Sequence, residues 1–190
     1  MVLKMEAVKK VGVNKIAKII LTAILGTVLL TISAKIKIPF YPVPMTMQTV
    51  VVLFLGIILG SKIGLLTVSL YLLEGIYGLP VFAGTPEKGV GFIYFSGPTM
   101  GYLLGFLIAV YFAGSFKYEK SLTNNLIKLI FSVSFIYILG MIWLGILIGW
   151  EKPIFKLGAQ PFLLAELFKI LLLLFLVPNL LKIKKLIKIT

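Results

Sequence analysis

Long apolar segments separated by proline, glycine and lysine place the strongest limit on how this chain can fold. A helix that crosses the hydrocarbon core of a membrane needs about 20 mostly apolar residues, and apolar residues make up 60% of the 190-residue chain. The candidate spans are residues 16–34, 46–59, 63–77, 98–114, 125–150 and 160–181. The sequence therefore predicts one all-α integral membrane domain over residues 1–190, built as a six-helix transmembrane bundle.

The lysines predict how this bundle lies in the membrane. Basic segments stand at both ends of the chain, residues 1–15 and 182–190, and with six spans most of the 19 lysines fall on the side that holds both ends. Since lysine-rich connections stay in the cytoplasm, both termini are expected to be cytoplasmic, in a multi-pass protein of the cell membrane. The five further apolar segments favour an uncleaved first span over a signal peptide.

The composition excludes several classes of function. The chain has no cysteine and no histidine, its cationic residues are all lysine, and its six anionic residues are all glutamate. Thiol chemistry, histidine acid–base catalysis and most sets of metal ligands are therefore excluded. The net charge of +13 is placed between apolar segments rather than on one basic face, which fits lipid better than nucleic acid. We expect no catalytic residue, no metal and no cofactor.

A charged pair lies in the last apolar segment, "PFLLAELFKILLLLFLVPNLL". Glu166 and Lys169 are three residues apart and share one face of a helix. They lie in the outer half of the membrane in the predicted orientation, about 7 and 12 Å along the helix from Pro161. An ionisable residue at membrane depth costs about 2.5–3.5 kcal/mol on insertion scales. The two charges neutralise each other, or Lys169 extends along its stem to the interface, or the pair forms a ligand site open to the outer face.

Other residues near the predicted outer face are weaker candidates. Gln48 either contacts a ligand or bonds to a neighbouring helix, and the preceding Thr46 is expected to cap its helix. Glu74 is a second carboxylate within an apolar segment. Four aromatic residues either wall an apolar pocket or belong to the aromatic belt of the membrane interface. They are Tyr41, Phe82, Tyr94 and Tyr102.

Five motifs in order resemble one known family. They are "PVPMTMQT" (42–49), "G…LGSKIG" (56–64), "YLLEGIYGLPVFAG" (71–84), "GPTMGYLLGF" (97–106) and "PFLLAELFK" (161–169). The chain resembles the BioY family, the biotin-specific S-components (substrate-binding subunits) of energy-coupling factor (ECF) transporters, over about residues 15–182. The resemblance implies a six-helix S-component fold in a prokaryotic cell membrane, which captures biotin with high affinity near the extracellular side.

The resemblance also implies roles for the charged residues. Glu166 stands where the family commonly has aspartate, and is expected to bond the ureido ring of biotin. Lys169 matches the family's membrane lysine and is expected to serve the carboxylate of the ligand. The glycine-rich third loop of the family reads "AGTPEKGVG" here. In that loop Lys88 is either a ligand contact or a solvated side chain.

The first span carries a pattern of small residues. Thr22 and Gly26, and likewise Ala23 and Thr27, are four residues apart, a spacing that lets helices approach closely. The resemblance implies that such positions dock the transmembrane coupling subunit of the transporter. Packing within the bundle is the alternative interpretation.

No segment of the sequence reads as an ATP site. The stretch "GIILGSKI" lacks the spacing and order of a phosphate-binding loop. By resemblance, ATP hydrolysis is expected from two cytoplasmic ATPase partners, joined through the coupling subunit. Two alternatives stay open: an S-component for another vitamin, and an ion-coupled small-solute carrier that uses Glu166 and Lys169 as a relay.

Overall fold

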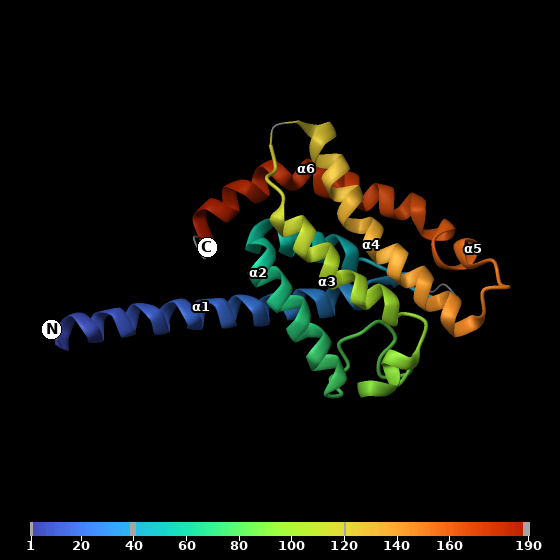
Figure 1. Ribbon diagram of the computed structural model, residues 1–190, viewed down its shortest axis with the longest axis horizontal. Helices are drawn as coiled ribbons and strands as arrows, with labels where there is room; N and C mark the ends of the chain where they lie inside the picture. The colour runs from blue at the N-terminus through green and yellow to red at the C-terminus, as the bar shows by residue number, and fades with distance from the viewer. Residues whose placement is uncertain (1, 39–40, 120, 188–190) are drawn as a thin grey trace.

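The computed structural model describes residues 2–38, 41–119 and 121–187, with side chains described for 15–37, 41–119 and 121–186. The chain is almost entirely helical (Figure 1). The elements in chain order are α1 (Val2–Lys35), β1 (Lys37–Ile38), β2 (Met45–Thr46), α2 (Gln48–Ile76), the 3-10 helix η1 (Gly91–Ser96), α3 (Met100–Ser115), α4 (Leu122–Ile148), α5 (Ile154–Gly158), η2 (Gln160–Phe162) and α6 (Leu163–Ile187).

The predicted apolar segments are all helical, but two of them belong to one helix. Among the described residues, four helices are long and apolar enough to cross a membrane, and α3 is a shorter apolar helix. The segments 46–59 and 63–77 were expected as separate spans and instead form α2, which is broken at Gly60. The sixfold crossing stays a prediction. Residues 2–15 of the basic N-terminal segment are helical backbone and belong to α1. Residue 1, the side chains through residue 14 and residues 188–190 of the basic tail lie outside the described residues.

The break in α2 is where α3 approaches most closely. Gly60 has φ 77° and ψ 173°, a backbone conformation that only glycine adopts without strain. A Cβ on Gly114 of α3 would meet the backbone of Gly60 and Ser61, and one on Gly56 would meet the backbone of Val110. Small residues thus let the two backbones touch, which maximises dispersion contact where lipid offers no hydrophobic driving force.

The small residues of α1 pack inside the bundle. Ala23 and Thr27 are each 2% exposed, and a Cβ on Gly26 would meet Thr67 of α2. Thr22 is half-buried, and its hydroxyl donates to the carbonyl of Lys18. Ala23, Gly26 and Thr27 are therefore occupied by contacts within the chain, and the opposite side of α1 is exposed and apolar.

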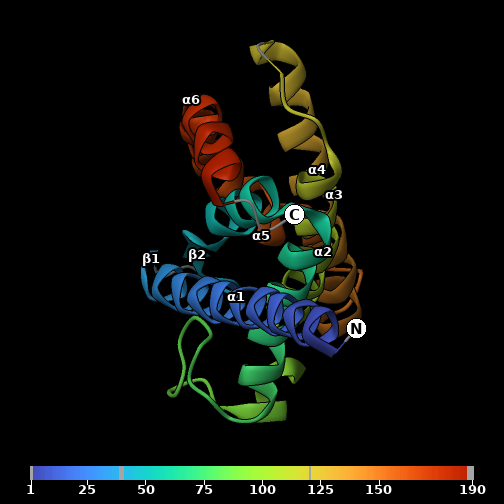
Figure 2. The same cartoon turned by 90° about the vertical axis from the view of Figure 1, so that its left-hand side faces the viewer.

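Two connections cover one end of the helices. The strands β1 and β2 form an antiparallel pair beside the end of α1 (Figure 2), a short element that the sequence did not predict. The segment 77–99, which contains η1, is held to α1 by Lys35, whose ammonium group donates to the carbonyls of Phe82 and Thr85 at 3.0 Å each. The start of α1 and the end of α6 both lie toward the left in Figure 1, away from α5 and from this segment.

The close contact at Gly114 predicts a stability effect. Gly114→Ala should push α3 away from α2, because the added methyl group meets backbone that cannot turn aside. Overpacking of this kind costs about 1–3 kcal/mol, so the melting temperature of the detergent-solubilised protein should fall by several degrees. Ser115→Ala removes only an exposed hydroxyl from the next residue and is the matched control. Equal melting temperatures for the two variants would contradict the contact.

Candidate ligand-binding site

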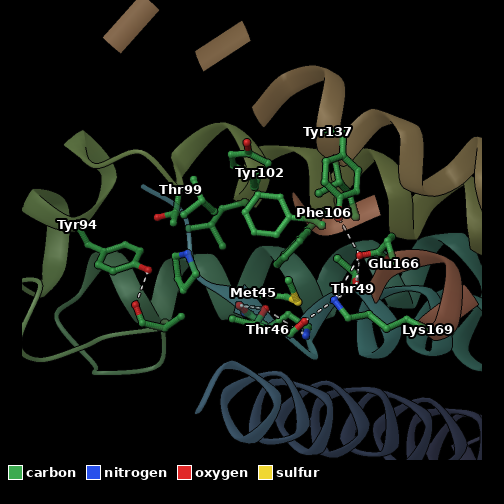
Figure 3. Close-up of a pocket in the computed structure, with 17 residues that line it drawn as sticks. Met45, Thr46, Thr49, Tyr94, Thr99, Tyr102, Phe106, Tyr137, Glu166 and Lys169 are labelled. Atoms are coloured by element: carbon green, nitrogen blue, oxygen red, sulfur yellow. Dashed lines mark hydrogen bonds and ion pairs between the residues drawn. The ribbon is translucent and has the colours of Figure 1, made fainter. Parts of the chain in front are cut away.

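A cavity lies among α2, α3, α4 and α6, under the two covering connections (Figure 3). Most of its wall is apolar or aromatic, and polar groups enter from α2, α4 and α6. The lining residues are Val43, Pro44, Met45, Thr46, Gln48, Thr49, Ala83, Tyr94, Thr99, Tyr102, Leu103, Phe106, Ile136, Tyr137, Phe162, Glu166 and Lys169. An enclosed apolar space with a few convergent polar groups is the usual form of a small-molecule site.

Within the described part of the chain, one oxygen of Glu166 receives all the hydrogen bonds made to this carboxylate. Oε2 accepts from the hydroxyl of Tyr137 at 3.0 Å, from the hydroxyl of Thr49 at 3.1 Å and from the ammonium group of Lys169 at 3.3 Å. These donors come from α4, α2 and α6. The carboxylate thus ties three helices together at one atom, and its cost at membrane depth is offset by charge-assisted bonds.

The other oxygen of Glu166 is free. Among the buried side-chain nitrogen and oxygen atoms of the described residues, Oε1 is the one without a hydrogen-bond partner, and the side chain is only 4% exposed. A buried acceptor left without a donor costs about 1–3 kcal/mol. Glu166 lies in the first turn of α6, where the helix dipole favours a negative charge but supplies no donor to this atom. Because Glu166 lines the cavity, Oε1 is an unpaired acceptor on a cavity-lining side chain.

Lys169 is already engaged within the protein. Besides its 3.3 Å contact with Glu166, its ammonium group donates to the carbonyl of Thr46 at 2.6 Å and to the hydroxyl of Thr49 at 3.4 Å. The three N–H groups of a lysine therefore have three acceptors. Glu166 and Lys169 thus share one end of the cavity, while Tyr94 lies at the other end in Figure 3.

The remaining predicted residues that line the cavity use their polar atoms to hold its walls. Gln48 donates through Nε2 to the hydroxyl of Tyr71 at 2.8 Å. Tyr94 donates to the carbonyl of Ala83 at 2.8 Å, and burial raises the pKa of its hydroxyl, which keeps it a neutral donor. Tyr102 donates to the carbonyl of Gly158 at 2.7 Å. The rings of Tyr94 and Tyr102 and the methylene groups of Gln48 can still contact a ligand.

Four predicted residues lie outside this lining. Tyr41 is 86% exposed and Lys88 is exposed, while Glu74 is half-buried on α2. Phe82 is buried, but it packs against Tyr71, Tyr94 and Phe95 behind the cavity wall. The predicted cap is also different: Met47, not Thr46, is the N-cap of α2. None of these four residues contacts the cluster formed by Glu166 and its three donors. Phe82 supports the cavity wall only indirectly, through Tyr94.

Two residues of the site escaped the sequence analysis. Thr49 lies in the motif "PVPMTMQT", but nothing in the sequence shows that its hydroxyl reaches Glu166, 117 residues later. Tyr137 stands inside a long apolar segment, among aromatic residues of which Phe131 and Trp150 are exposed. A polar hydroxyl within a predicted span is a signal that could have drawn attention to it, without naming its partner.

With this geometry in place, comparison with known proteins defines the family. The model of the BioY family matches residues 5–186, and the chain belongs to this family. A probable biotin transporter BioY of Pyrococcus horikoshii is 34% identical over 153 residues, which are 80% of this chain and 90% of the relative. The biotin transporter BioY of Thermotoga maritima is 36% identical over 145 residues, 76% of this chain and 84% of the relative.

A solved structure supports the fold. A crystal structure of the S-component for biotin from an ECF-type ABC transporter superposes with a TM-score of 0.74 at 26% sequence identity, covering 89% of this chain and 93% of that one. The predictions of an all-helical S-component fold and of the BioY family are confirmed. With its long apolar helices, the chain is a multi-pass membrane protein.

The hydroxyl of Tyr71 predicts a second stability effect. It accepts from Gln48 in the cavity wall and donates to the carbonyl of Val81 at 2.9 Å in the covering segment. Tyr71→Phe should leave both buried groups unpaired, at a cost of about 1–3 kcal/mol, and should lower the melting temperature. Tyr77→Phe, which changes a tyrosine that is 84% exposed at the end of the same helix, should not. A similar shift for both variants would show that this hydroxyl does not stabilise the wall.

Proposed function

We propose that this chain captures biotin from outside the cell and carries it across the membrane as the S-component of an ECF-type transporter. The observation that carries the proposal is the buried Oε1 of Glu166, which has no donor among the described residues of this BioY family member and belongs to a side chain that lines the cavity. The named relatives are biotin transporters, and the matching structure is an S-component for biotin.

The chemistry of biotin fits both the apolar walls of the cavity and its polar end at Glu166 and Lys169. Its ureido ring has two N–H donors and a carbonyl acceptor, and its thiolane ring and tail are apolar. An N–H of the ureido ring would satisfy Oε1 of Glu166, while Phe106, Leu103 and Ile136 would contact the thiolane ring. A site built to pair with a polar group rejects analogues that lack it far more strongly than an apolar pocket rejects a missing methylene.

The contact between Glu166 and Lys169 changes the role proposed for the lysine. The family resemblance implies that Lys169 serves the carboxylate of biotin. The tail of biotin holds this carboxylate away from the ureido ring, however, so two side chains 3.3 Å apart cannot serve both ends of an extended ligand. We place Lys169 at the ureido end, where it balances the charge of Glu166. The tail then extends toward Tyr94 and Thr99, beneath the covering segment.

The orientation and the partners follow from the same proposal. The bundle crosses the membrane six times with both termini in the cytoplasm, so the cavity opens outward. A transmembrane coupling subunit and two cytoplasmic ATPases supply the energy, and the chain itself hydrolyses no ATP. Since Ala23, Gly26 and Thr27 are occupied by α2, the coupling subunit would meet the exposed side of α1 or displace that packing. An S-component for another vitamin, or an ion-coupled carrier, has less support from the family.

Calorimetric titration of biotin into the purified, detergent-solubilised chain tests the substrate. We expect submicromolar binding of biotin, and no binding of riboflavin or thiamine, because neither brings a ureido donor on an apolar bicycle. Binding of either control in place of biotin would assign the chain to another vitamin. Absence of biotin binding by a folded, monodisperse sample would contradict the proposal.

Lys169→Ala tests the charged end of the site. The change leaves the Glu166 carboxylate without its counter-ion, and loss of one partner of a desolvated charge pair commonly costs about 2–5 kcal/mol. Biotin affinity should therefore fall well over tenfold. Lys62→Ala, which removes an exposed lysine elsewhere, should leave the affinity unchanged. Unchanged affinity of Lys169→Ala would remove this residue from the site.

A further inference from the structure

The Glu166 carboxylate is held asymmetrically, and this asymmetry has a consequence for selectivity. Oε2 accepts three hydrogen bonds from the protein and Oε1 accepts none among the described residues. A carboxylate rotates freely unless its oxygens are distinguished by their partners, since its terminal torsion is broad. The donors to Oε2 therefore decide which oxygen a ligand meets and in which direction its lone pairs point.

Tyr137 is the donor best placed to do this. Its hydroxyl makes the shortest of the three contacts, at 3.0 Å, and it comes from α4, a helix distinct from the one that carries Glu166. Its ring is itself held, edge to face with Tyr102 at a centroid distance of 6.2 Å. Thr49 donates from a third direction, on α2, at 3.1 Å. Lys169, by contrast, shares α6 with Glu166 and is divided among three acceptors.

We propose that Tyr137, supported by Thr49, is a positioning residue that presents Oε1 of Glu166 as a single, fixed acceptor, so that the site selects ligands by one N–H group at that point. The inference rests on the proposed function, because the ligand group concerned is a ureido N–H of biotin. One of the two ureido N–H groups donates to this oxygen. Loss of that N–H should therefore weaken binding more than loss of the other.

The test compares biotin with its two isomers methylated on one or the other ureido nitrogen, by calorimetric titration. For the wild type, methylation of the nitrogen that faces Oε1 should weaken binding much more than methylation of the other. Tyr137→Phe should weaken biotin binding about tenfold, as expected for loss of a hydrogen bond to a charged group, and should reduce the difference between the isomers. Tyr118→Phe removes another half-buried hydroxyl, one that donates to the carbonyl of Ala113 outside the cavity, and should change neither value.

A second background separates positioning from a general loss of structure. In Glu166→Gln, Tyr137→Phe should weaken biotin binding no more than about twofold further, because coupled residues are not additive. An equal loss in both backgrounds, or an unchanged difference between the isomers, would overturn the inference. If Tyr137→Phe is unstable, Thr49→Val removes the second donor to Oε2, and the same binding measurements are made on that variant. Failure of the wild type to bind biotin would overturn the proposed function as well, whereas failure of the variants alone leaves biotin capture intact.

Discussion

The buried contact between Glu166 and its three donors is the interaction on which the rest of the site depends. It joins α2, α4 and α6 through one oxygen, at a depth where an isolated charge is costly. Removal of one donor leaves a charge without its compensation, whereas the complete cluster stabilises the mutual arrangement of the helices. The same atoms therefore determine both the shape of the cavity and the group that is offered to a ligand.

The apolar part of the structure supports this cluster without specifying it. Glycines at positions 60 and 114 let α2 and α3 meet backbone to backbone, which is the packing that a membrane favours. The break in α2 at Gly60 separates the half that begins at Gln48 and Thr49 from the half that ends beside the covering segment. Lys35 of α1 and Tyr71 of α2 bond to the covering segment 77–99. The segment over the cavity is therefore anchored to two helices.

The predicted charged pair lines the cavity, whereas several candidates that were chosen from their place in the connections lie outside it. Glu166 and Lys169 lie on one helical face and were predictable together, because the geometry of a helix is local. Lys88 and Tyr41 stand in connections, where the course of the backbone decides which way a side chain points, and both turn out exposed. The small residues of α1 were correctly seen as a close-packing surface, but the sequence could not say which helix they meet.

The sequence by itself determined that the chain is helical and apolar enough for a membrane, that it lacks the residues for most catalysis and metal binding, and that it carries a charged pair on its last helix. These properties depend on composition, on segment length and on the periodicity of a single helix. Only the tertiary structure decided that Oε2 of Glu166 accepts from Thr49, Tyr137 and Lys169 while Oε1 has no donor among the described residues. That distinction arises from three helices converging on one point, and residues 29 and 117 positions apart in the chain meet there only because the bundle is packed.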